Sequence, residues 1–516
     1  MKRREFLKSV AGAGGSALLT GCGQVPTAPT KQPNVIFIFA DQLRADICGV
    51  YGGKNIETPQ IDRLAREGVT FENGLSTCPL CTPFRGMLMT GRYPTHSGHV
   101  LTWLETSPEQ NPNCLGNVFA EAGYETGFIG KWHLTGGHLR GAGKLLPTGQ
   151  ARMKKFLQGL AELKRSNPHS EFVAPGPDRL GFDSWAAYNF HTAFNDYWYY
   201  GDEPNKIVTD GYETDVEFDQ AIDYVEKRKQ SEKPFFLVLA PHPPHPPFKT
   251  DWCPAGYLDQ IPEELQWSPN VPEDDPRRKN QLQARCHYAM TKNMDDNVGR
   301  LLDFLDRSGM AEDTILVFTS DHGEMLGSHG RTAKLVPYTE SVGIPLIMRW
   351  PGRIPANLRS EDLFTPMDHL PTLSALAGIA SPDEADGLDL SPVVLGQRRS
   401  DRDAVLMMNY SSHFNFFDTG TYYPEWRAVH TGQHTYTRWL SGEEELYDNG
   451  QDPFQMQNLA SGQADHVTLN HLRNRLKALL AEAHDDFLPG TAYADWFDDR
   501  RKLIRTALGP VPSDIS

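Results

Sequence analysis

Four short apolar runs along the chain each end in charged or imidazole side chains. They are NVIFIFAD at 34–41, YETGFIGKWH at 124–133, FFLVLAPHPPH at 235–245 and TILVFTSDH at 314–322. Runs that are apolar on both faces are typical of buried strands in a parallel sheet, and open α/β sheets bind ligands beyond the carboxyl ends of such strands. We therefore expect the four polar ends to meet at one edge of a sheet.

Helical periodicity separates these strands. Apolar side chains recur at helical spacing in 215–229, where Thr214 and Glu217 have the spacing of a capping box, and again from Met294 to Leu305, before Gly309. Alternation of strands and helices predicts an α/β domain with a doubly wound, mostly parallel sheet and helices on both faces. We assign residues 34–424 to this domain.

The pattern changes after residue 424. WRAVHTGQHTYTRWL and EEELYD are typical of short antiparallel strands, and an apolar stripe comprises Leu469, Leu472, Leu476, Leu479 and Leu480. Residues 425–516 are thus predicted to form a smaller C-terminal subdomain of antiparallel sheet and one helix.

The first residues have the features of an export signal. Arg3 and Arg4 in RREFLK resemble a twin-arginine signal, and the apolar stretch that follows is too short to span a bilayer. LTGC at 19–22 resembles a lipobox, in which Cys22 would carry a lipid anchor; a plain signal peptide cleaved elsewhere is the alternative. We predict an export signal at 1–22, a linker at 23–33, the twin-arginine export machinery as a partner, and a lipid-anchored protein in the periplasm or cell envelope.

Composition narrows the function classes. The 516 residues carry a formal net charge of -16, which disfavours nonspecific binding to nucleic acid or to an anionic membrane surface. Seven cysteines are too few to form the framework of an exported protein of this size, so we expect at least one buried free thiol.

The segment CPLCTPFRGMLMTGR at 78–92 places Cys81 at or near the start of a helix. Pro83 suits the first helical turn, and Gly91 suits the end of the helix. Free backbone N–H groups at such a start favour an anion or a thiolate. Taken alone, the segment fits a reactive thiol, a phosphate site or a capped turn. A redox pair with Cys78 is less consistent with the sequence, because no thioredoxin-like unit surrounds it.

Cys81-Thr82-Pro83-Phe84-Arg85, with a downstream Thr-Gly, resembles the C-x-P-x-R signature of type I, formylglycine-dependent sulfatases. Phe84 departs from the family, which usually has a small residue there. Further parts of the family pattern are present in the family's order along the chain. They are Asp41-Gln42, Lys131 and His133 in GKWH, His245 in PHPPH, Asp321-His322 in SDHG, and Lys334. The chain therefore resembles a bacterial exported member of this family within the alkaline-phosphatase-like superfamily.

The resemblance implies hydrolysis of a sulfate monoester, with a sulfated saccharide as the expected substrate. A formylglycine-generating maturase would oxidise Cys81 to an aldehyde, which hydrates to a geminal diol. One hydroxyl would attack sulfur and release the alcohol; the second would lose its proton to His133, and return to the aldehyde would expel sulfate. The other implied contacts are Arg85 with the hydrated residue, and Lys131, Lys334 and His245 around the sulfate, with His245 or Lys334 as donor to the leaving oxygen. His242 could exchange roles with His245.

The resemblance also implies a bound divalent cation. Its ligands would be Asp41, the Gln42 carbonyl, residue 81, Asp321 and His322. Ligands that are mostly oxygen, with no set of thiolates, favour Ca²⁺, with Mg²⁺ as the second choice.

Two other functions use the same residues. A phosphonate monoester or phosphodiester hydrolase could employ the same formylglycine, and a sulfated-glycan-binding protein would leave Cys81 unconverted.

The aromatic-rich segment 184–204 is consistent with stacking on a sugar or with core packing.

Overall fold

The four apolar runs form adjacent strands of one eight-stranded sheet. The computed structural model describes residues 31–137, 169–411, 413–414, 422–461, 466–498 and 502–511. The strands are β1 (Asn34–Ala40), β3 (Glu125–Lys131), β7 (Phe235–Ala240) and β8 (Thr314–Ser320). They lie in the spatial order β8-β1-β7-β3 and are parallel to one another, so their carboxyl ends meet as predicted.

Four further strands complete the sheet in the order β10-β2-β9-β8-β1-β7-β3-β4. These are β2 (Val69–Gly74), β4 (Ser184–Tyr188), β9 (Leu346–Arg349) and β10 (Leu358–Phe364). Only β9 runs antiparallel to its neighbours within this sheet. The prediction of a doubly wound, mostly parallel sheet is therefore confirmed.

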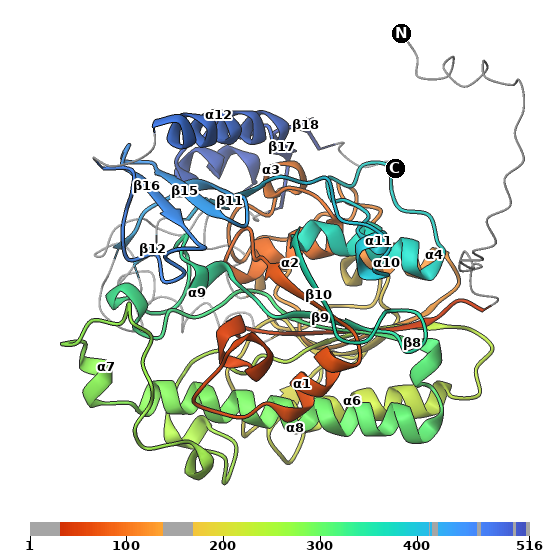
Figure 1. The fold of residues 1–516 in the computed structure, drawn as a ribbon. Helices are drawn as coiled ribbons and strands as arrows, with labels where there is room; N and C mark the ends of the chain where they lie inside the picture. The colour runs from red at the N-terminus through yellow and green to blue at the C-terminus, as the bar shows by residue number, and fades with distance from the viewer. Residues whose placement is uncertain are drawn as a thin grey trace, which may run out of the picture. The chain divides into compact units, whose positions relative to one another are not determined.

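Helices cover both faces of the sheet (Figure 1). Because successive side chains of a strand point to opposite faces, Phe37 and Phe39 of β1 pack with one layer of helices and Ile36 and Ile38 with the other. The first layer contains α2 (Cys81–Thr90), α4 (Leu115–Glu121), α10 (His369–Ala377) and α11 (Ser391–Val394). The second contains α1 (Pro59–Arg66), α6 (Glu213–Arg228) and α8 (Leu282–Ser308).

One predicted helix start is wrong. Helix α6 begins at Glu213, with Tyr212 as its N-cap residue and no side-chain capping bond, so Thr214 and Glu217 form no capping box. Both side chains are instead fully buried. Helix α8 ends as expected, with Gly309 in the left-handed region at φ 72°.

A four-stranded antiparallel sheet in the order β11-β14-β15-β16 forms the predicted smaller sheet. Its strands are β11 (Val405–Asn409), β14 (Trp426–His430), β15 (His434–Trp439) and β16 (Glu444–Asp448). Helix α12 (His466–Glu482) packs on it through Leu469, Leu472, Leu476 and Leu479. The boundary predicted at residue 425 falls after the first strand of this sheet, because β11 comes from the preceding region.

The remaining described α-helices and strands are short. They are α3 (Pro94–Ser97), α7 (Pro276–Lys279), α9 (Thr339–Val342), β5 (Trp198–Tyr199), β6 (Ile207–Val208), β12 (His413–Phe414), β13 (Tyr422–Tyr423), β17 (Arg505–Thr506) and β18 (Gly509–Pro510). Within the described ranges, no helix has the length and apolar character needed to cross a bilayer. The predicted export signal and Cys22 lie outside those ranges.

A buried ion pair ties the segment after α12 to the small sheet. Arg427 of β14 donates to both carboxylate oxygens of Asp485, at 2.5 and 3.2 Å, and neither side chain is exposed. The guanidinium also donates to the Asn409 carbonyl at 2.9 Å and lies 4.0 Å from the ring centre of Tyr410.

Replacing Asp485 with alanine is expected to lower the free energy of unfolding by about 3–5 kcal/mol, because Arg427 would stay buried without its counter-ion. The neighbouring Asp486→Ala is the matched control, since Asp486 is exposed and its loss should change stability by less than about 0.5 kcal/mol. Urea unfolding of both variants checks this. Equal urea midpoints for Asp485→Ala and Asp486→Ala would show that the Arg427–Asp485 ion pair does not stabilise the fold.

Candidate active site at the carboxyl edge of the sheet

Cys81 lies at the first position of α2, as the sequence pattern indicated. The helix follows Leu80, which is extended, and ends where Gly91 adopts φ 65°. Phe84 points into the sheet layer and packs near Phe39, with ring centroids 6.2 Å apart. The unusual phenylalanine of the signature is therefore a core residue.

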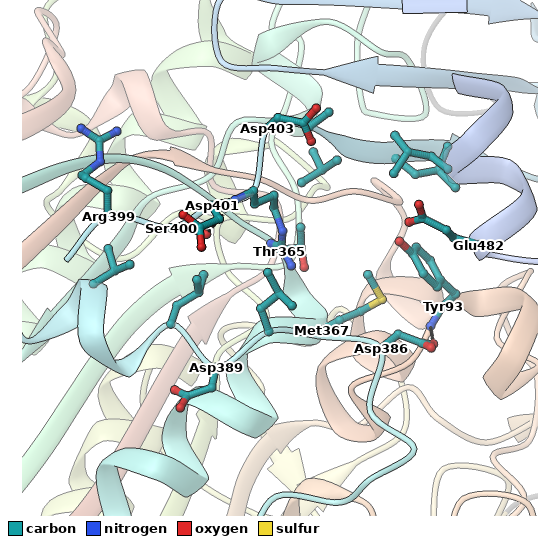
Figure 2. A pocket seen from close by; sticks show the side chains of 18 of the residues that line it. Tyr93, Thr365, Met367, Asp386, Asp389, Arg399, Ser400, Asp401, Asp403 and Glu482 are labelled. Atoms are coloured by element: carbon teal, nitrogen blue, oxygen red, sulfur yellow. Dashed lines mark hydrogen bonds between the residues drawn. The ribbon is translucent and has the colours of Figure 1, made fainter. Parts of the chain in front are cut away.

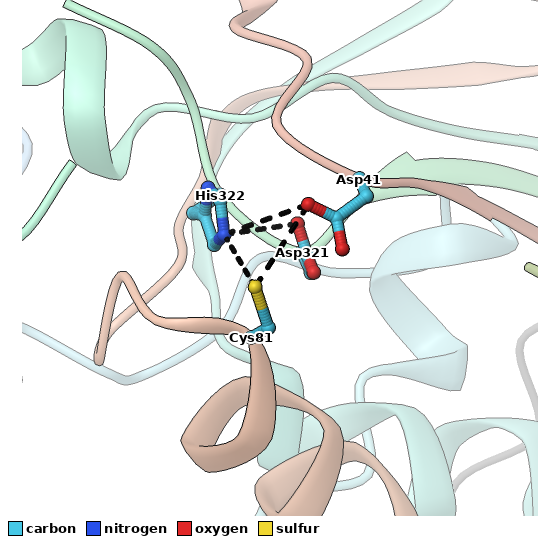
Figure 3. Close-up of side chains that lie close together, drawn as sticks. All are labelled: Asp41, Cys81, Asp321 and His322. Carbon is cyan, nitrogen blue, oxygen red and sulfur yellow. Dashed lines mark hydrogen bonds and ion pairs between the residues drawn. The ribbon is translucent and has the colours of Figure 1, made fainter. Parts of the chain in front are cut away.

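Two fully buried carboxylates face the Cys81 sulfur. Asp41 directly follows β1 and Asp321 directly follows β8, its strand neighbour. Cys81 Sγ lies 3.8 Å from Asp41 Oδ1 and 3.3 Å from His322 Nε2, and His322 Nε2 lies 3.4 Å from Asp321 Oδ1 (Figure 3). The four ligand atoms all lie within 4.8 Å of one another.

The protonation of His322 indicates that this cluster can bind a cation. Its Nδ1 lies 3.1 Å from the Gly323 carbonyl, which can only accept, so Nδ1 carries the hydrogen. Burial and the Lys334 charge hold the pKa of His322 well below its usual value, so the ring is neutral. Its Nε2 lone pair then points toward two carboxylates. Electron-pair donors converge in this way around a cation, and the donor set fits a divalent metal ion.

Two cations bind the outer oxygens of these carboxylates. Arg85 donates to Asp41 Oδ2 at 3.1 Å and to Asp321 Oδ2 at 3.4 Å, while Lys131 Nζ lies 2.6 Å from Asp41 Oδ2 and 3.7 Å from Cys81 Sγ. The other carboxylate oxygens, Oδ1 of Asp41 and Oδ1 of Asp321, face Cys81 and His322. Arg85 thus holds the carboxylates in place, and its predicted contact with a hydrated residue 81 stays a prediction.

The two carboxyl groups differ in acidity. Burial alone would raise the pKa of Asp41, but the positive charge of Lys131 holds it well below its usual value. For Asp321, burial and the negative charge of Asp41 raise the pKa to about 7. Adding a cation between them would favour ionisation of both.

Gln42 connects several parts of the site. Its backbone carbonyl accepts a bond from His287 Nε2 at 2.9 Å, and its side-chain Oε1 accepts one from Lys334 Nζ at 2.5 Å. Its side-chain amide donates to Glu324, which is buried. The backbone and side-chain carbonyl oxygens of Gln42 therefore each already accept one hydrogen bond. The role of Gln42 as a metal ligand stays a prediction.

Glu324 is a residue that sequence reasoning missed. Besides binding the Gln42 amide, its carboxylate accepts the backbone N–H groups of Leu326 at 3.1 Å and Ala333 at 2.6 Å. Ala333 precedes Lys334, so this carboxylate organises the loop that presents the lysine. The position of Glu324 directly after SDHG was the available signal.

Three histidines stand around this centre. His242 and His245 both lie beside Asp41, with ring centroids 4.5 Å apart. His245 is half-buried, whereas His242 is fully buried. His133, at φ 53°, packs against the rings of Trp103 and Phe190, with centroids 4.5 and 5.0 Å from its own.

Phe190 belongs to the aromatic-rich segment, and its ring also lies 4.7 Å from Lys131 Nζ. Much of the same segment is buried packing, including Tyr188 and Tyr197. One member of the segment thus lines the site, while others serve the core.

A separate pocket of about 490 Å³ contains none of these residues (Figure 2). Its four arginines are already paired with carboxylates: Arg398 with Asp401, Arg399 with Asp362, Arg402 with Asp368 and Arg475 with Asp403, at 4.0, 2.8, 2.5 and 2.8 Å. It therefore offers a poor site for an anion, and the carboxyl edge of the sheet remains the candidate active site.

Comparison with known proteins matches this geometry. The Sulfatase family model matches residues 33–379, and the model for the C-terminal part of N-sulphoglucosamine sulphohydrolase matches residues 327–482. The chain belongs to the sulfatase family. It is thus a sulfuric ester hydrolase by family, as the sequence motifs predicted.

Individual sulfatases resemble the chain over most of its length. An ulvan-active sulfatase of Formosa agariphila is 34% identical over 468 residues, covering 89% of this chain and 83% of the relative. The solved yidJ sulfatase of Bacteroides fragilis has a TM-score of 0.75 and 28% identity, covering 90% of this chain and 98% of that one. The fold is accordingly alkaline-phosphatase-like.

A phosphonate monoester hydrolase of Agrobacterium radiobacter shares the fold at a TM-score of 0.61 and 20% identity, covering 88% of this chain and 96% of its own. At this identity the likeness describes the fold alone.

Removing the Glu324 carboxylate is expected to lower kcat/KM for a sulfate ester on the order of 10–100-fold, because Gln42 and Lys334 lose the group that orients them. Glu324→Ala should show this loss, and Glu324→Gln, which keeps an acceptor oxygen, a smaller one. Steady-state kinetics with melting curves for both variants separate misplacement of Lys334 from unfolding. The exposed Glu312→Ala is the control. Unchanged kinetics in Glu324→Ala would rule out this positioning role.

Proposed function

We propose that this sulfatase removes sulfate from a sulfated saccharide, using formylglycine made from Cys81 and a bound divalent cation. The observation that carries the proposal is the position of Cys81: it starts α2 within a C-T-P-F-R segment and lies within 4 Å of Asp41, Lys131 and His322. The similarity to an ulvan-active sulfatase supports a saccharide substrate.

The charges around residue 81 suit a sulfate ester. Its sulfur is shielded by negative oxygens, so a catalyst must neutralise them while presenting a nucleophile in line with the leaving oxygen. Lys131 Nζ lies beside residue 81, and the half-buried Lys334 enters from the loop held by Glu324. These two ammonium groups would bind the sulfate oxygens.

The hydrogen bonds of the histidines suggest how protons move. His245 Nδ1 lies 2.6 Å from the Pro246 carbonyl, so Nδ1 carries the hydrogen; burial and Lys334 lower the pKa of His245, which leaves Nε2 as an acceptor. We therefore assign the proton donor for the leaving oxygen to Lys334 and contact with the ester to His245, which is more exposed than His242. His133 would accept the proton of the second hydroxyl of residue 81.

Asp41, Asp321, His322 and residue 81 would hold the cation, with the Gln42 carbonyl as a further ligand. Calcium is proposed because oxygen ligands predominate, with magnesium second. The cation would offset the charge that builds up on the sulfate and on residue 81.

Two alternatives use the same residues. Phosphonate monoester or phosphodiester hydrolysis is supported only by a shared fold, whereas the more similar relative is a sulfatase. A glycan-binding protein would result if Cys81 stayed a thiol.

We also propose that the chain is exported by the twin-arginine machinery after a maturase has acted on Cys81, and that Cys22 anchors it in the cell envelope. The support is the Arg3-Arg4 pair and the lipobox-like LTGC. Residues 34–424 would supply the catalytic domain, and residues 425–516 would form the C-terminal subdomain together with β11 of the preceding region.

Cys81→Ala, made together with a maturase, is expected to lower sulfate release from a panel of defined sulfated saccharides by at least about 1,000-fold, because the nucleophile is lost. Cys114→Ala, which empties a buried position away from the site, should keep its activity. Peptide mass analysis should find an aldehyde at residue 81 of the active protein. An active preparation with an unmodified thiol there contradicts the mechanism, and faster turnover of aryl phosphonate than aryl sulfate esters would favour the alternative.

Removing divalent cations with a chelator is expected to abolish activity and lower the melting midpoint. Added Ca²⁺ should restore both more effectively than Mg²⁺, because a ligand that binds only the folded state stabilises it. Asp321→Asn should lose the Ca²⁺-dependent rise in midpoint, whereas the exposed Asp313→Asn should keep it. If the melting midpoint of the wild-type protein did not change on addition of Ca²⁺, the proposed ion would be wrong.

A further inference from the structure

Two half-buried aromatic side chains, Trp103 and Phe190, lie at the active site, and the proposed mechanism gives neither of them a role. The centroid of the Phe190 ring lies 4.7 Å from Lys131 Nζ, 5.0 Å from the His133 ring and 6.1 Å from the His245 ring. The indole of Trp103 contacts the same group of rings, 4.5 Å from His133 and 5.0 Å from Phe190. Partly exposed aromatic surface therefore lies beside the groups that would bind the sulfate.

Trp103 is held in place through the residue that follows Cys81. The backbone N–H of Trp103 donates to Thr82 Oγ1 at 3.4 Å, and the same hydroxyl donates to the His133 carbonyl at 3.0 Å. The indole also lies against Gly137, where an added Cβ would come within 3.2 Å of Trp103 Cζ3. The start of α2 thus fixes the position of the indole relative to residue 81.

The backbone of Trp103 departs from the conformation that a bulky residue prefers. Its φ of 59° lies in the left-handed region, which glycine and asparagine adopt at a lower cost than tryptophan does. Such strain persists where the surrounding structure enforces it, and it clusters at active sites and ligand-binding sites. The local backbone would be satisfied better by asparagine, so it does not account for a tryptophan at this position.

We propose that Trp103 and Phe190 form a sugar-binding surface, against which the pyranose ring that bears the sulfate packs one of its faces. The proposal rests on the proposed sulfatase function and names the feature of the substrate that these two residues recognise. A pyranose ring carries C–H groups on its faces and hydroxyls around its edge, so an aromatic ring can cover a face while the hydroxyls keep their hydrogen bonds. Lys131 and Lys334 would bind the sulfate group, and the two aromatic rings would bind the sugar that carries it.

Positioning of His133 is the competing explanation, since both rings also contact its imidazole. Rings that only held His133 would matter equally for every sulfate ester, because His133 would act on residue 81 after the alcohol has left. Rings that bind the sugar would matter for a saccharide ester, and they would matter little for an acyclic alkyl sulfate. The two explanations therefore differ in how the effect of a substitution depends on the substrate.

The test compares Trp103→Asn with the wild-type protein on two esters: an acyclic alkyl sulfate and the sulfated saccharide of the panel that is hydrolysed fastest. Asparagine tolerates the left-handed backbone, so the variant loses the indole without added strain, and its melting curve checks that it folds. We expect kcat/KM for the saccharide to fall about 10–100-fold and kcat/KM for the alkyl sulfate to stay within about 3-fold. Trp103→Phe should recover part of the loss, and Phe190→Leu should also affect the saccharide more than the alkyl sulfate.

Phe487→Asn is the matched control. Phe487 is likewise a half-buried aromatic residue in the left-handed region, at φ 54°, but its ring lies 5.0 Å from the guanidinium of Arg427 in the small sheet. This variant should keep the wild-type kcat/KM on both esters.

The outcomes separate this proposal from the proposed function. Equal losses on the two esters in Trp103→Asn, or no loss on either, would overturn the sugar-binding surface and leave the sulfatase activity standing. If the wild-type protein hydrolysed neither ester, the proposed function would fail, and calorimetry would still test the surface. The Kd of Cys81→Ala for the sulfated saccharide that it binds most tightly should rise about 10–100-fold when Trp103→Asn is added. An unchanged Kd would overturn the surface.

Discussion

Two carboxyl groups buried side by side constrain this site more than any other interaction. Asp41 and Asp321 end adjacent strands, and neither is exposed to water that could screen their repulsion. Arg85 and Lys131 offset part of this cost at the outer oxygens. Since Arg85 belongs to α2, the same ion pairs fix the start of that helix, and with it the sulfur of Cys81, against the carboxylates.

This dependence explains why the arrangement of strands and the site could be predicted together. Each apolar run ended in a polar residue, and parallel strands place such ends at one edge, so Asp41, Lys131, His245 and Asp321 converge for a topological reason. The small sheet and α12 were equally visible, because their apolar residues recur with the periods of strand and helix. The strand β11 was not assigned to the small sheet, since its pairing with β14 is set by contacts distant in sequence.

The sequence was less informative where one residue type can serve two purposes. Thr214 and Glu217 have capping-box spacing, yet both are fully buried within α6 and neither caps the helix. The sequence did not predict a role for Glu324, because a glutamate in a loop is usually solvated. In the structure it accepts hydrogen bonds from two backbone N–H groups and from the Gln42 amide. Phe84 departs from the family pattern for a reason of packing that no motif contains.

The burial of the signature segment also sets an order of events in the cell. Every residue from Cys81 to Arg85 is enclosed in the folded protein, with Phe84 in the central core. An enzyme that reads those side chains and oxidises the cysteine can reach them only before α2 packs onto the sheet. The proposed conversion of Cys81 would then precede folding, and the proposed twin-arginine route, which accepts folded cargo, would come last.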